Sequence, residues 1–404
     1  MLALNGGSPL RNSPFPSWPI YGHGEEEALL AVLHSDRWFL AEHTERFERD
    51  FAAFQEAKFG IATSNGTTAL QVALSAIGIR PGDEVIVPAY TFIATASAVV
   101  ASGGIPIFAD IDPDTYNIAP QSVANAITEK TLAIIGVHIG GCPCDLDALN
   151  ALAADHQIHL IEDAAQAHAA AWKGRRVGAI GHLGTFSFQA SKNLCAGEGG
   201  FITTDDEVLA ERAWSVHNCG RSRTGAWYEH PLIGSNYRIS EFHAALLLHQ
   251  LERLEAQTAR RTENSALLTS LLHQIEGIAP MGEDERTTTH AHHLYIFRYQ
   301  AESTGLTRDR FIEALSAEGI PCSSGYRPLY REAAFTTHFI ASPLSSPYFQ
   351  GRPDYSGVSC PVTEHACVRE AVWLTQNMLL GTADDMRDIA SAINKVLTHA
   401  AALL

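Results

Sequence analysis

Residues 59–88 read FGIATSNGTTALQVALSAIGIRPGDEVIVP, and this stretch decides the fold class. Two short apolar runs, FGIAT and EVIVP, flank a segment in which Leu70, Ala73, Leu74 and Ile77 recur at the spacing of one helix face. A glycine directly after this segment is typical of a helix end. The stretch therefore predicts a strand, a helix and a second strand in succession.

The same alternation continues along the chain. Five more short apolar runs follow, which makes seven in all. Helical segments lie between most of the first five of these seven runs. The later runs are IPIFAD, LAIIGVH, HLIED, GTFSF and GGFITT, which end near Asp110, His138, Asp163, Phe188 and Thr204. Strands that alternate with helices at this spacing imply an α/β fold with a mostly parallel, seven-stranded sheet that helices cover on both faces.

The character of the sequence changes toward both ends. The beginning is rich in Pro, Gly, Asn and aromatic residues, as an extended arm would be, and a helical pattern starts at about Glu25. A long helix is expected from Ile239 to beyond Leu254, and short strands, helices and a Pro/Ser/Gly-rich segment follow it. We therefore expect an N-terminal arm (1–24), a large domain (25–254) and a smaller α+β C-terminal domain (255–404).

Composition and charge exclude several classes of protein. The 404 residues are 46% hydrophobic, which is ample for a large core and excludes a disordered chain. The net charge of −17 makes nucleic acid and anionic membranes poor partners, because both are negatively charged. The seven scattered cysteines form no disulfide framework, and neither a secretory signal nor an apolar run of membrane-spanning length is visible. We expect a cytoplasmic protein.

Lysine is rare in this chain, and one lysine has an unusual setting. Lys192 lies in TFSFQASKNLCAGEGG, directly after an apolar strand and before a glycine-rich turn, whereas the other four lysines lie in polar or terminal surroundings. A lysine in a largely apolar site loses its proton more easily, which suits Schiff-base chemistry. The alternative is a solvated loop lysine.

Two further features lie where strands end, which is where ligands bind in open α/β sheets. Asp163 ends the run IHLIED and could pair with a pyridinium nitrogen, although a helix cap or a metal ligand is an alternative. The segment TSNGTTAL (63–70) opens a helix and offers an anion site, yet it lacks the Gly-Lys-Ser/Thr element of a P-loop. Phe92, after the second strand, could stack on a flat ring or simply belong to the core. An amine, an acid and an anion site together match what pyridoxal phosphate requires of a protein.

Three other groups leave their roles open. Cys142 and Cys144, with His138 nearby, provide too few ligands for a structural zinc site, and no metal is expected. A histidine cluster begins an expected strand, where alternation would send His290 and His292 to one face. The cluster could line the substrate entrance or lie on the surface. An aromatic and a basic residue lie in a loop that could bind an acidic amino donor or a sugar hydroxyl. The residues of these last two groups are His290, His292 and His293, and Tyr326 and Arg327.

Seven motifs stand in the order of one known family. They are SNGTTAL, VPAYTFIATA, ADIDPDTYNI, VHIGG, IEDAAQAHAA, SFQASKNLCAGEGG and GSNYRISEFHAALLLHQLERL. In these motifs the chain resembles the DegT/DnrJ/EryC1/StrS sugar aminotransferases, from about Trp38 to Leu254 and more weakly to the C-terminus. The resemblance implies the pyridoxal-phosphate-dependent transferase fold type I, which is aspartate aminotransferase-like.

The resemblance also implies roles for single residues. Lys192 would form the internal aldimine, Asp163 would hold the pyridine nitrogen, and Gln166 would lie near the ring hydroxyl. Phe92 would stack on the ring. The phosphate would be held by Gly66, Thr67 and Ser187, and by Asn236 of a neighbouring subunit, so that two chains of a homodimer would share each active site. One departure from the family is Ala169, where a glycine is usual.

Within the family, PSWPIYG (16–22), YRPLY (326–330) and AVWLTQNMLLG (371–381) resemble a branch that acts on keto-cyclitols such as scyllo-inosose, or makes related aminated rings for antibiotics. The implied reaction moves an amino group from glutamate or glutamine, by way of pyridoxamine phosphate, to a keto-sugar or keto-cyclitol. A nucleotide-linked keto-sugar is the alternative acceptor. A non-catalytic cofactor-binding relative is a contrasting alternative, and so is a dehydratase of the same fold. Lys192 argues against both.

Overall fold

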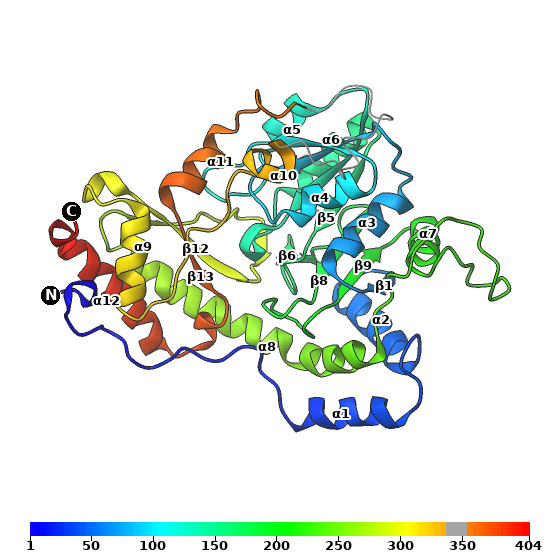
Figure 1. Ribbon diagram of the computed structural model, residues 1–404, viewed down its shortest axis with the longest axis horizontal. Helices are drawn as coiled ribbons and strands as arrows, with labels where there is room; N and C mark the ends of the chain where they lie inside the picture. The colour runs from blue at the N-terminus through cyan, green and yellow to red at the C-terminus, as the bar shows by residue number, and fades with distance from the viewer. Residues whose placement is uncertain (337–353) are drawn as a thin grey trace.

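The protein, described here from a computed structural model, is built around one large sheet and one small sheet that a long helix connects (Figure 1). The structure describes residues 1–336 and 354–404. Part of the expected Pro/Ser/Gly-rich segment (321–361) therefore lies outside the described residues. No helix in the described ranges combines the length and the apolar character needed to cross a bilayer.

The large sheet has the seven expected strands, in the spatial order β1-β9-β8-β5-β4-β2-β3. Strand β9 runs antiparallel to both of its neighbours, and the other pairs are parallel, so the prediction of a mostly parallel sheet is confirmed. The strands are β1 (Phe59–Thr63), β2 (Glu84–Pro88), β3 (Ile105–Ala109), β4 (Thr131–Val137), β5 (His159–Asp163), β8 (Leu183–Ser187) and β9 (Gly200–Thr204).

Helices cover both faces of this sheet, as expected for buried parallel strands. Helices α3, α4 and α7 contribute to the core on one face, and α2, α5, α6 and α8 contribute to the core on the other. These helices are α2 (Glu42–Phe54), α3 (Gly66–Ala76), α4 (Ala94–Ala101), α5 (Pro120–Ala126), α6 (Leu146–His156), α7 (Glu207–His217) and α8 (Glu241–Leu272).

Helix α3 shows how the local sequence builds the site. Its predicted apolar face, including Leu70 and Leu74, is buried, and Gly78 follows its end with a φ of +84°. At its start Asn65 caps the helix, because its Oδ1 accepts a hydrogen bond from the Thr68 N–H at 2.9 Å. The Thr68 hydroxyl in turn accepts from the Asn65 N–H, which completes a capping box. The first turn of α3 is therefore held rigidly at the end of β1.

The C-terminal part has its own core around an antiparallel sheet of β10 (Ile278–Pro280), β12 (Leu294–Tyr299) and β13 (Ala371–Thr375). Helices α9 (Arg308–Ala317) and α12 (Ala383–Thr398) pack against it. Helix α8 runs without a break past residue 254, where the sequence suggested a boundary, and carries the chain from the large sheet to the small one (Figure 1). A short sheet of β6 (Ala171–Trp172), β7 (Arg175–Arg176) and β11 (Thr287–Thr289) also joins the two parts.

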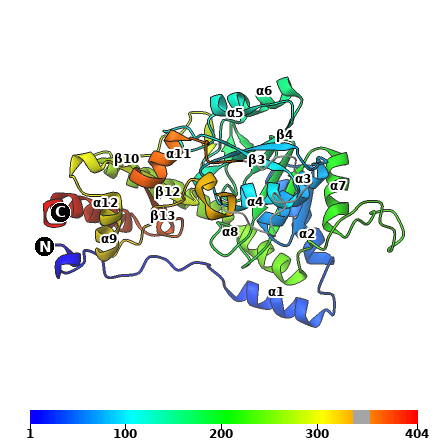
Figure 2. The same ribbon diagram turned by 45° about the horizontal axis from the view of Figure 1, so that its top comes forward.

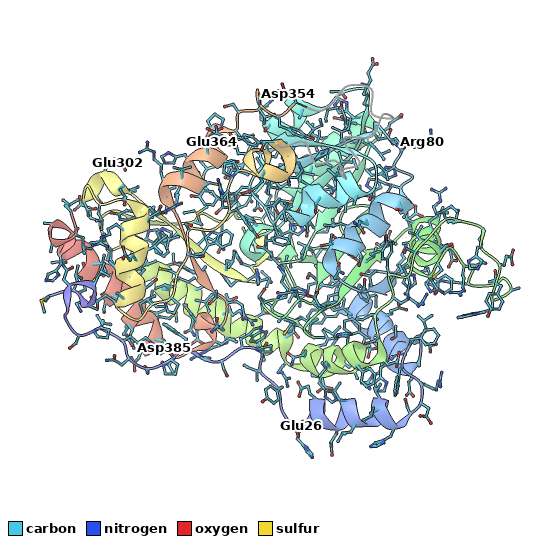
Figure 3. The ribbon with its side chains drawn as sticks, in the orientation of Figure 1. Glu26, Arg80, Glu302, Asp354, Glu364 and Asp385 are labelled. Carbon is cyan, nitrogen blue, oxygen red and sulfur yellow. The ribbon has the colours of Figure 1, made fainter. Side chains whose placement is uncertain are left out.

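The N-terminal arm is extended apart from a short 3-10 helix, Ala3–Asn5, and it leads into α1 (His23–His34). It is tied to the C-terminal part, since Arg11 pairs with Asp388 at 2.8 Å and the Asn377 amide donates to the Pro16 carbonyl at 2.7 Å. Both chain ends therefore lie at the same end of the molecule (Figure 2). Charged side chains such as Glu26 lie around the periphery (Figure 3), as the acidic composition leads one to expect.

Candidate active site

A cleft of about 1070 Å³ opens at the edge of the large sheet where β1, β5 and β8 end. Parallel strands end at the same edge of a sheet, so residues far apart in the sequence meet there. Seven of the eight residues that the sequence suggested for cofactor binding line this cleft, namely Gly66, Thr67, Phe92, Asp163, Gln166, Ser187 and Lys192.

Asp163 is the last residue of β5 and is almost fully buried. Its Oδ2 accepts a hydrogen bond from the Thr95 hydroxyl at 2.9 Å, and its Oδ1 accepts a longer one from the Ala165 N–H at 3.3 Å. Burial raises the pKa of Asp163, and these hydrogen bonds and the Lys192 ammonium only partly oppose that rise. The carboxylate is thus fixed in orientation, and none of the cations in residues 1–336 and 354–404 forms an ion pair with it.

Lys192 faces the same cleft from the loop between β8 and β9. A tight turn holds this loop, because the Lys192 N–H donates to the Gln189 carbonyl at 2.8 Å and the Ala190 N–H donates to the Gly197 carbonyl at 3.0 Å. Within the described residues its Nζ has no hydrogen bond or ion pair. Burial lowers the pKa of Lys192 to about 8, with Asp163 opposing the shift. Such an amine differs from the solvated loop lysine of the alternative interpretation.

The start of α3 and the end of β8 approach each other closely in the cleft. A Cβ added at Gly66 would lie 2.7 Å from Cβ of Ser187, so only glycine allows this close approach. The free N–H groups of the first helical turn and the Thr67 and Ser187 hydroxyls are suitable donors to phosphate oxygens. The residues present therefore fit the phosphate group that the sequence led us to expect.

Gln166 connects the cleft floor to an aromatic wall. Its Oε1 accepts from the Gly140 N–H at 2.7 Å, and its Nε2 donates to the Tyr326 hydroxyl at 3.0 Å. Tyr326 packs edge-on against Trp373, with ring centroids 4.6 Å apart. Tyr326 therefore belongs to the cleft. Arg327, which the sequence placed beside it as a second candidate, is instead exposed and lies 3.7 Å from Glu332.

Phe92 and Asn236 differ from the others in their exposure. Phe92 lines the cleft with 56% of its surface exposed, so it does not belong to the core. Asn236 is also exposed and does not line the cleft of its own chain. Asn236 does not cap the nearby helix α8, because Ser240 is its N-cap residue, with its hydroxyl 3.5 Å from the His243 N–H.

His138 is engaged through both of its ring nitrogens. Its Nε2 lies 3.1 Å from Glu162 Oε2, and its Nδ1 accepts a hydrogen bond from the Cys144 N–H at 3.1 Å. No lone pair is left for a metal beside Cys142 and Cys144. Glu162 also accepts three backbone N–H bonds, so its pKa is lowered although burial alone would raise it.

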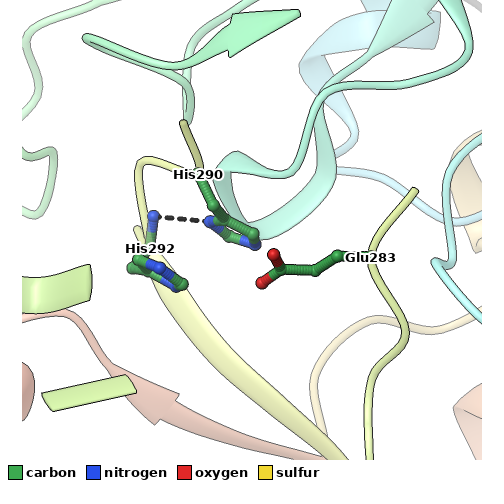
Figure 4. A group of neighbouring side chains, drawn as sticks. All are labelled: Glu283, His290 and His292. Atoms are coloured by element: carbon green, nitrogen blue, oxygen red, sulfur yellow. Dashed lines mark hydrogen bonds between the residues drawn. The ribbon is translucent and has the colours of Figure 1, made fainter. Parts of the chain in front are cut away.

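The histidine cluster does not begin a strand, which corrects the expectation from the sequence. Strand β12 starts at Leu294, and His292 has a φ of +49°, so the segment turns instead of alternating. The His290 and His292 rings still share one side, stacked with centroids 4.0 Å apart, and they lie near Glu283 (Figure 4). The His292 N–H donates to Nδ1 of His290 at 2.7 Å, so the lone pair of Nδ1 is used. The proton of a neutral His290 then lies on Nε2, and a protonated nitrogen does not bind a metal.

Sequence reasoning missed two cleft residues, Thr95 and Trp373. Thr95 orients Asp163 from α4, and its only sequence signal was its place three residues after Phe92. Trp373 arrives from β13, and nothing local in the sequence indicates that it reaches the cleft. His293 belongs to the cluster that the sequence suggested for the substrate entrance or the surface, and it does line the cleft.

Comparison with known proteins agrees with this geometry. The profile of the DegT/DnrJ/EryC1/StrS aminotransferase family matches residues 19–394. A protein of Micromonospora echinospora named L-glutamine:2-deoxy-scyllo-inosose aminotransferase is 40% identical, over 99% of this chain and 98% of its own. A protein of Streptoalloteichus tenebrarius named putative L-glutamine:3-amino-2,3-dideoxy-scyllo-inosose aminotransferase is 38% identical, over 100% and 99%.

Solved structures show the same fold. The crystal structure of 3-amino-5-hydroxybenzoic acid synthase superposes with a TM-score of 0.87 at 36% identity, over 96% of this chain and 100% of the other. DesI, solved with its TDP-sugar product, gives 0.85 at 32% identity, over 100% and 97%. NtdA of Bacillus subtilis, with bound cofactor PMP, gives 0.81 at 25% identity, over 96% and 86%. These likenesses span nearly the whole chain, which therefore belongs to the DegT/DnrJ/EryC1/StrS aminotransferase family.

Proposed function

We propose that this aminotransferase uses pyridoxal phosphate to move an amino group from glutamine to a keto-cyclitol of the scyllo-inosose type. The observation that carries the proposal is the pairing of an unpartnered amine, Lys192, with a buried carboxylate, Asp163, in one cleft. Two relatives of nearly full length and about the same identity have names that specify both glutamine and a scyllo-inosose.

The cleft suits pyridoxal phosphate in several places at once. Gly66, Thr67 and Ser187 would hold its phosphate, Asp163 its ring nitrogen, and Lys192 its aldehyde carbon. Phe92 and Gln166 would lie along the ring. When bound, the cofactor supplies a carbonyl that condenses with amines and a ring that stabilises the electron pair left when a C–H bond breaks.

The protein's own groups then orient that chemistry and move protons. A negative Asp163, oriented by the Thr95 hydroxyl, would favour a proton on the ring nitrogen of the bound cofactor, which would make that ring a better electron acceptor. With a pKa of about 8, Lys192 is partly neutral near physiological pH, so its Nζ can take a proton from one carbon and return it to another.

We further propose that two copies share each active site. The segment between α7 and α8 carries Asn236 and exposes large apolar side chains, with Tyr228 at 83% and Ile233 at 97% exposure. Exposed apolar groups of this size are typical of a surface that a partner covers. A second copy of the chain would cover them, and Asn236 would then reach the partner's phosphate site.

The acceptor proposed here is a free ring, not a nucleotide-linked sugar. Among the described residues that line the cleft, Lys192 is the only lysine or arginine. A diphosphate group calls for charge-assisted hydrogen bonds from cations, which these walls do not offer. DesI, whose structure holds a TDP-sugar, keeps the nucleotide-linked keto-sugar as the alternative.

Half-reactions test this proposal directly. The purified, cofactor-loaded protein is mixed with glutamine or glutamate, and the absorbance change of the cofactor is followed. The aminated form is then offered scyllo-inosose, 2-deoxy-scyllo-inosose and a TDP-linked keto-hexose, and the amine product is identified by mass spectrometry. We expect turnover with glutamine and a cyclitol. Turnover with the TDP-linked sugar alone would refute the proposed acceptor, and no spectral change with either donor would refute the proposed reaction.

A further inference from the structure

His293 occupies a position in the cleft that no part of the mechanism above uses. It follows the turn of His290 and His292, is only 7% exposed, and lines the cleft together with Lys192. Its neighbours His290 and His292 lie close to Glu283 instead (Figure 4). His293 is therefore the one member of the cluster whose ring borders the space available to a substrate.

Hydrogen bonds fix which nitrogen of His293 carries the proton. The Asn193 amide Nδ2 donates to the Ala291 carbonyl at 2.7 Å, which sets the orientation of that amide. Its Oδ1 then faces Nδ1 of His293 at 3.2 Å, and an amide oxygen only accepts. Nδ1 of His293 must therefore be the protonated nitrogen, and Nε2 must carry a lone pair.

The ring is also neutral. Burial, together with the nearby Lys192 ammonium, holds the pKa of His293 well below its usual range. Among residues 1–336 and 354–404 no group hydrogen-bonds Nε2. A neutral imidazole with one nitrogen locked by Asn193 thus presents an unused acceptor at the cleft, near the amine that takes part in the reaction.

We propose that His293 binds the acceptor ring, with Nε2 accepting a hydrogen bond from a hydroxyl group close to the ketone. The inference rests on the proposed function, because it concerns how a polyhydroxylated ketone is recognised. A keto-cyclitol carries hydroxyl donors around its ring, whereas carboxylate groups of an amino acid only accept and would be repelled by a bare nitrogen lone pair. His293 therefore suits a hydroxyl group of the acceptor and contributes little to the binding of the donor's carboxylate.

Two variants of His293 separate this role from a structural one. His293→Phe keeps an aromatic ring but removes the acceptor nitrogen, and His293→Gln restores an acceptor oxygen at similar reach. A substrate whose buried hydroxyl has no hydrogen-bond partner binds about 10- to 100-fold more weakly. We therefore expect kcat/KM for the cyclitol half-reaction to fall by about that factor in His293→Phe. The glutamine half-reaction should stay within about 2-fold of wild type, and His293→Gln should recover part of the loss.

His290→Asn serves as the matched control, because it changes a neighbouring imidazole outside the cleft and keeps an acceptor for the His292 N–H. The control should leave both half-reactions near wild type. Equal losses in the two half-reactions of His293→Phe, or no loss in either, would overturn the inference. A larger loss of kcat/KM in the glutamine half-reaction than in the cyclitol half-reaction of His293→Phe would overturn it as well.

Substrates that lack one hydroxyl complete the test. For wild type, cyclitol ketones deoxygenated at single carbons should include one whose kcat/KM is on the order of 10-fold lower, and His293→Phe should not distinguish that ketone from the parent. If His293→Phe discriminates as strongly as wild type at every carbon, His293 does not bind a hydroxyl. If wild type aminates no cyclitol but still reacts with glutamine, the proposed acceptor fails, an outcome distinct from the failure of the His293 assignment.

Discussion

Replacing Lys192 by methionine should stabilise the cofactor-free protein. The methionine side chain has a similar length and no charge, so the change removes mainly the ammonium group. Burial lowers the pKa of this lysine from 10.5 to about 8, with the attraction of Asp163 already included in that value. At about 1.4 kcal/mol per pKa unit, the charged lysine costs the folded protein about 3 kcal/mol at pH 7.

This cost depends on pH in a defined direction. Below pH 8 both the folded and the unfolded chain are protonated at Lys192, and the full penalty applies. Between pH 8 and 10.5 the unfolded chain binds more protons than the folded one, so the free energy of unfolding of wild type rises with pH. The advantage of Lys192→Met should therefore shrink from about 3 kcal/mol at pH 7 to about 1.5 kcal/mol at pH 9.5.

Urea unfolding of cofactor-stripped protein, followed by tryptophan fluorescence at both pH values and one protein concentration, measures this difference. Lys130→Met is the matched control, because Lys130 is exposed and its replacement should change stability by less than about 0.5 kcal/mol. A Lys192→Met variant that is no more stable than wild type at pH 7 would refute the assignment of a desolvated amine. So would an advantage that does not shrink at pH 9.5.

Three further outcomes are expected. Asp163→Asn should weaken pyridoxal phosphate binding by about 10- to 100-fold in an absorbance titration, whereas loss of a purely structural cap would lower the free energy of unfolding by about 1 kcal/mol and leave that binding unchanged. Ala169→Gly should raise the free energy of unfolding by about 0.5 kcal/mol in a urea titration, because Ala169 has a φ of +69°, and a loss of stability would contradict this. Mixing Lys192→Ala chains with Asn236→Ala chains should recover up to about a quarter of wild-type activity, since random exchange makes about half of the dimers mixed and each of these has one intact site. An active monomer in sedimentation would exclude the shared site.

The seven strands could be predicted because each is a short apolar run bounded by turn residues, and α3 because its apolar residues from Leu70 to Ile77 recur at helical spacing. The resemblance to a family then pointed to the cleft residues at the strand ends. The boundary near residue 254 could not be located, because α8 continues in one piece and nothing in a helical period marks where its neighbours change.

Residues from the C-terminal part could not be predicted in the same way. Tyr326 and Trp373 reach the cleft only because β12 and β13 pair and bring their side of the molecule against the large sheet. The sequence suggested a strand at His292, but a positive φ there turns the chain and gives His293 a different side from its neighbours. Such placements depend on tertiary packing, which overrides local pattern.

Adjacent residues at the end of β5 show how the fold separates structural from functional charge. Strand alternation sends Glu162 and Asp163 to opposite faces, and both are buried. Glu162 accepts three backbone N–H bonds and lies beside His138, so its charge is fully compensated and its pKa is lowered. Asp163 has one hydroxyl and one long backbone contact, and its pKa is raised. Because a buried charge without compensation destabilises a protein, the second arrangement is the one expected of a carboxylate that pairs with a cation of a bound ligand.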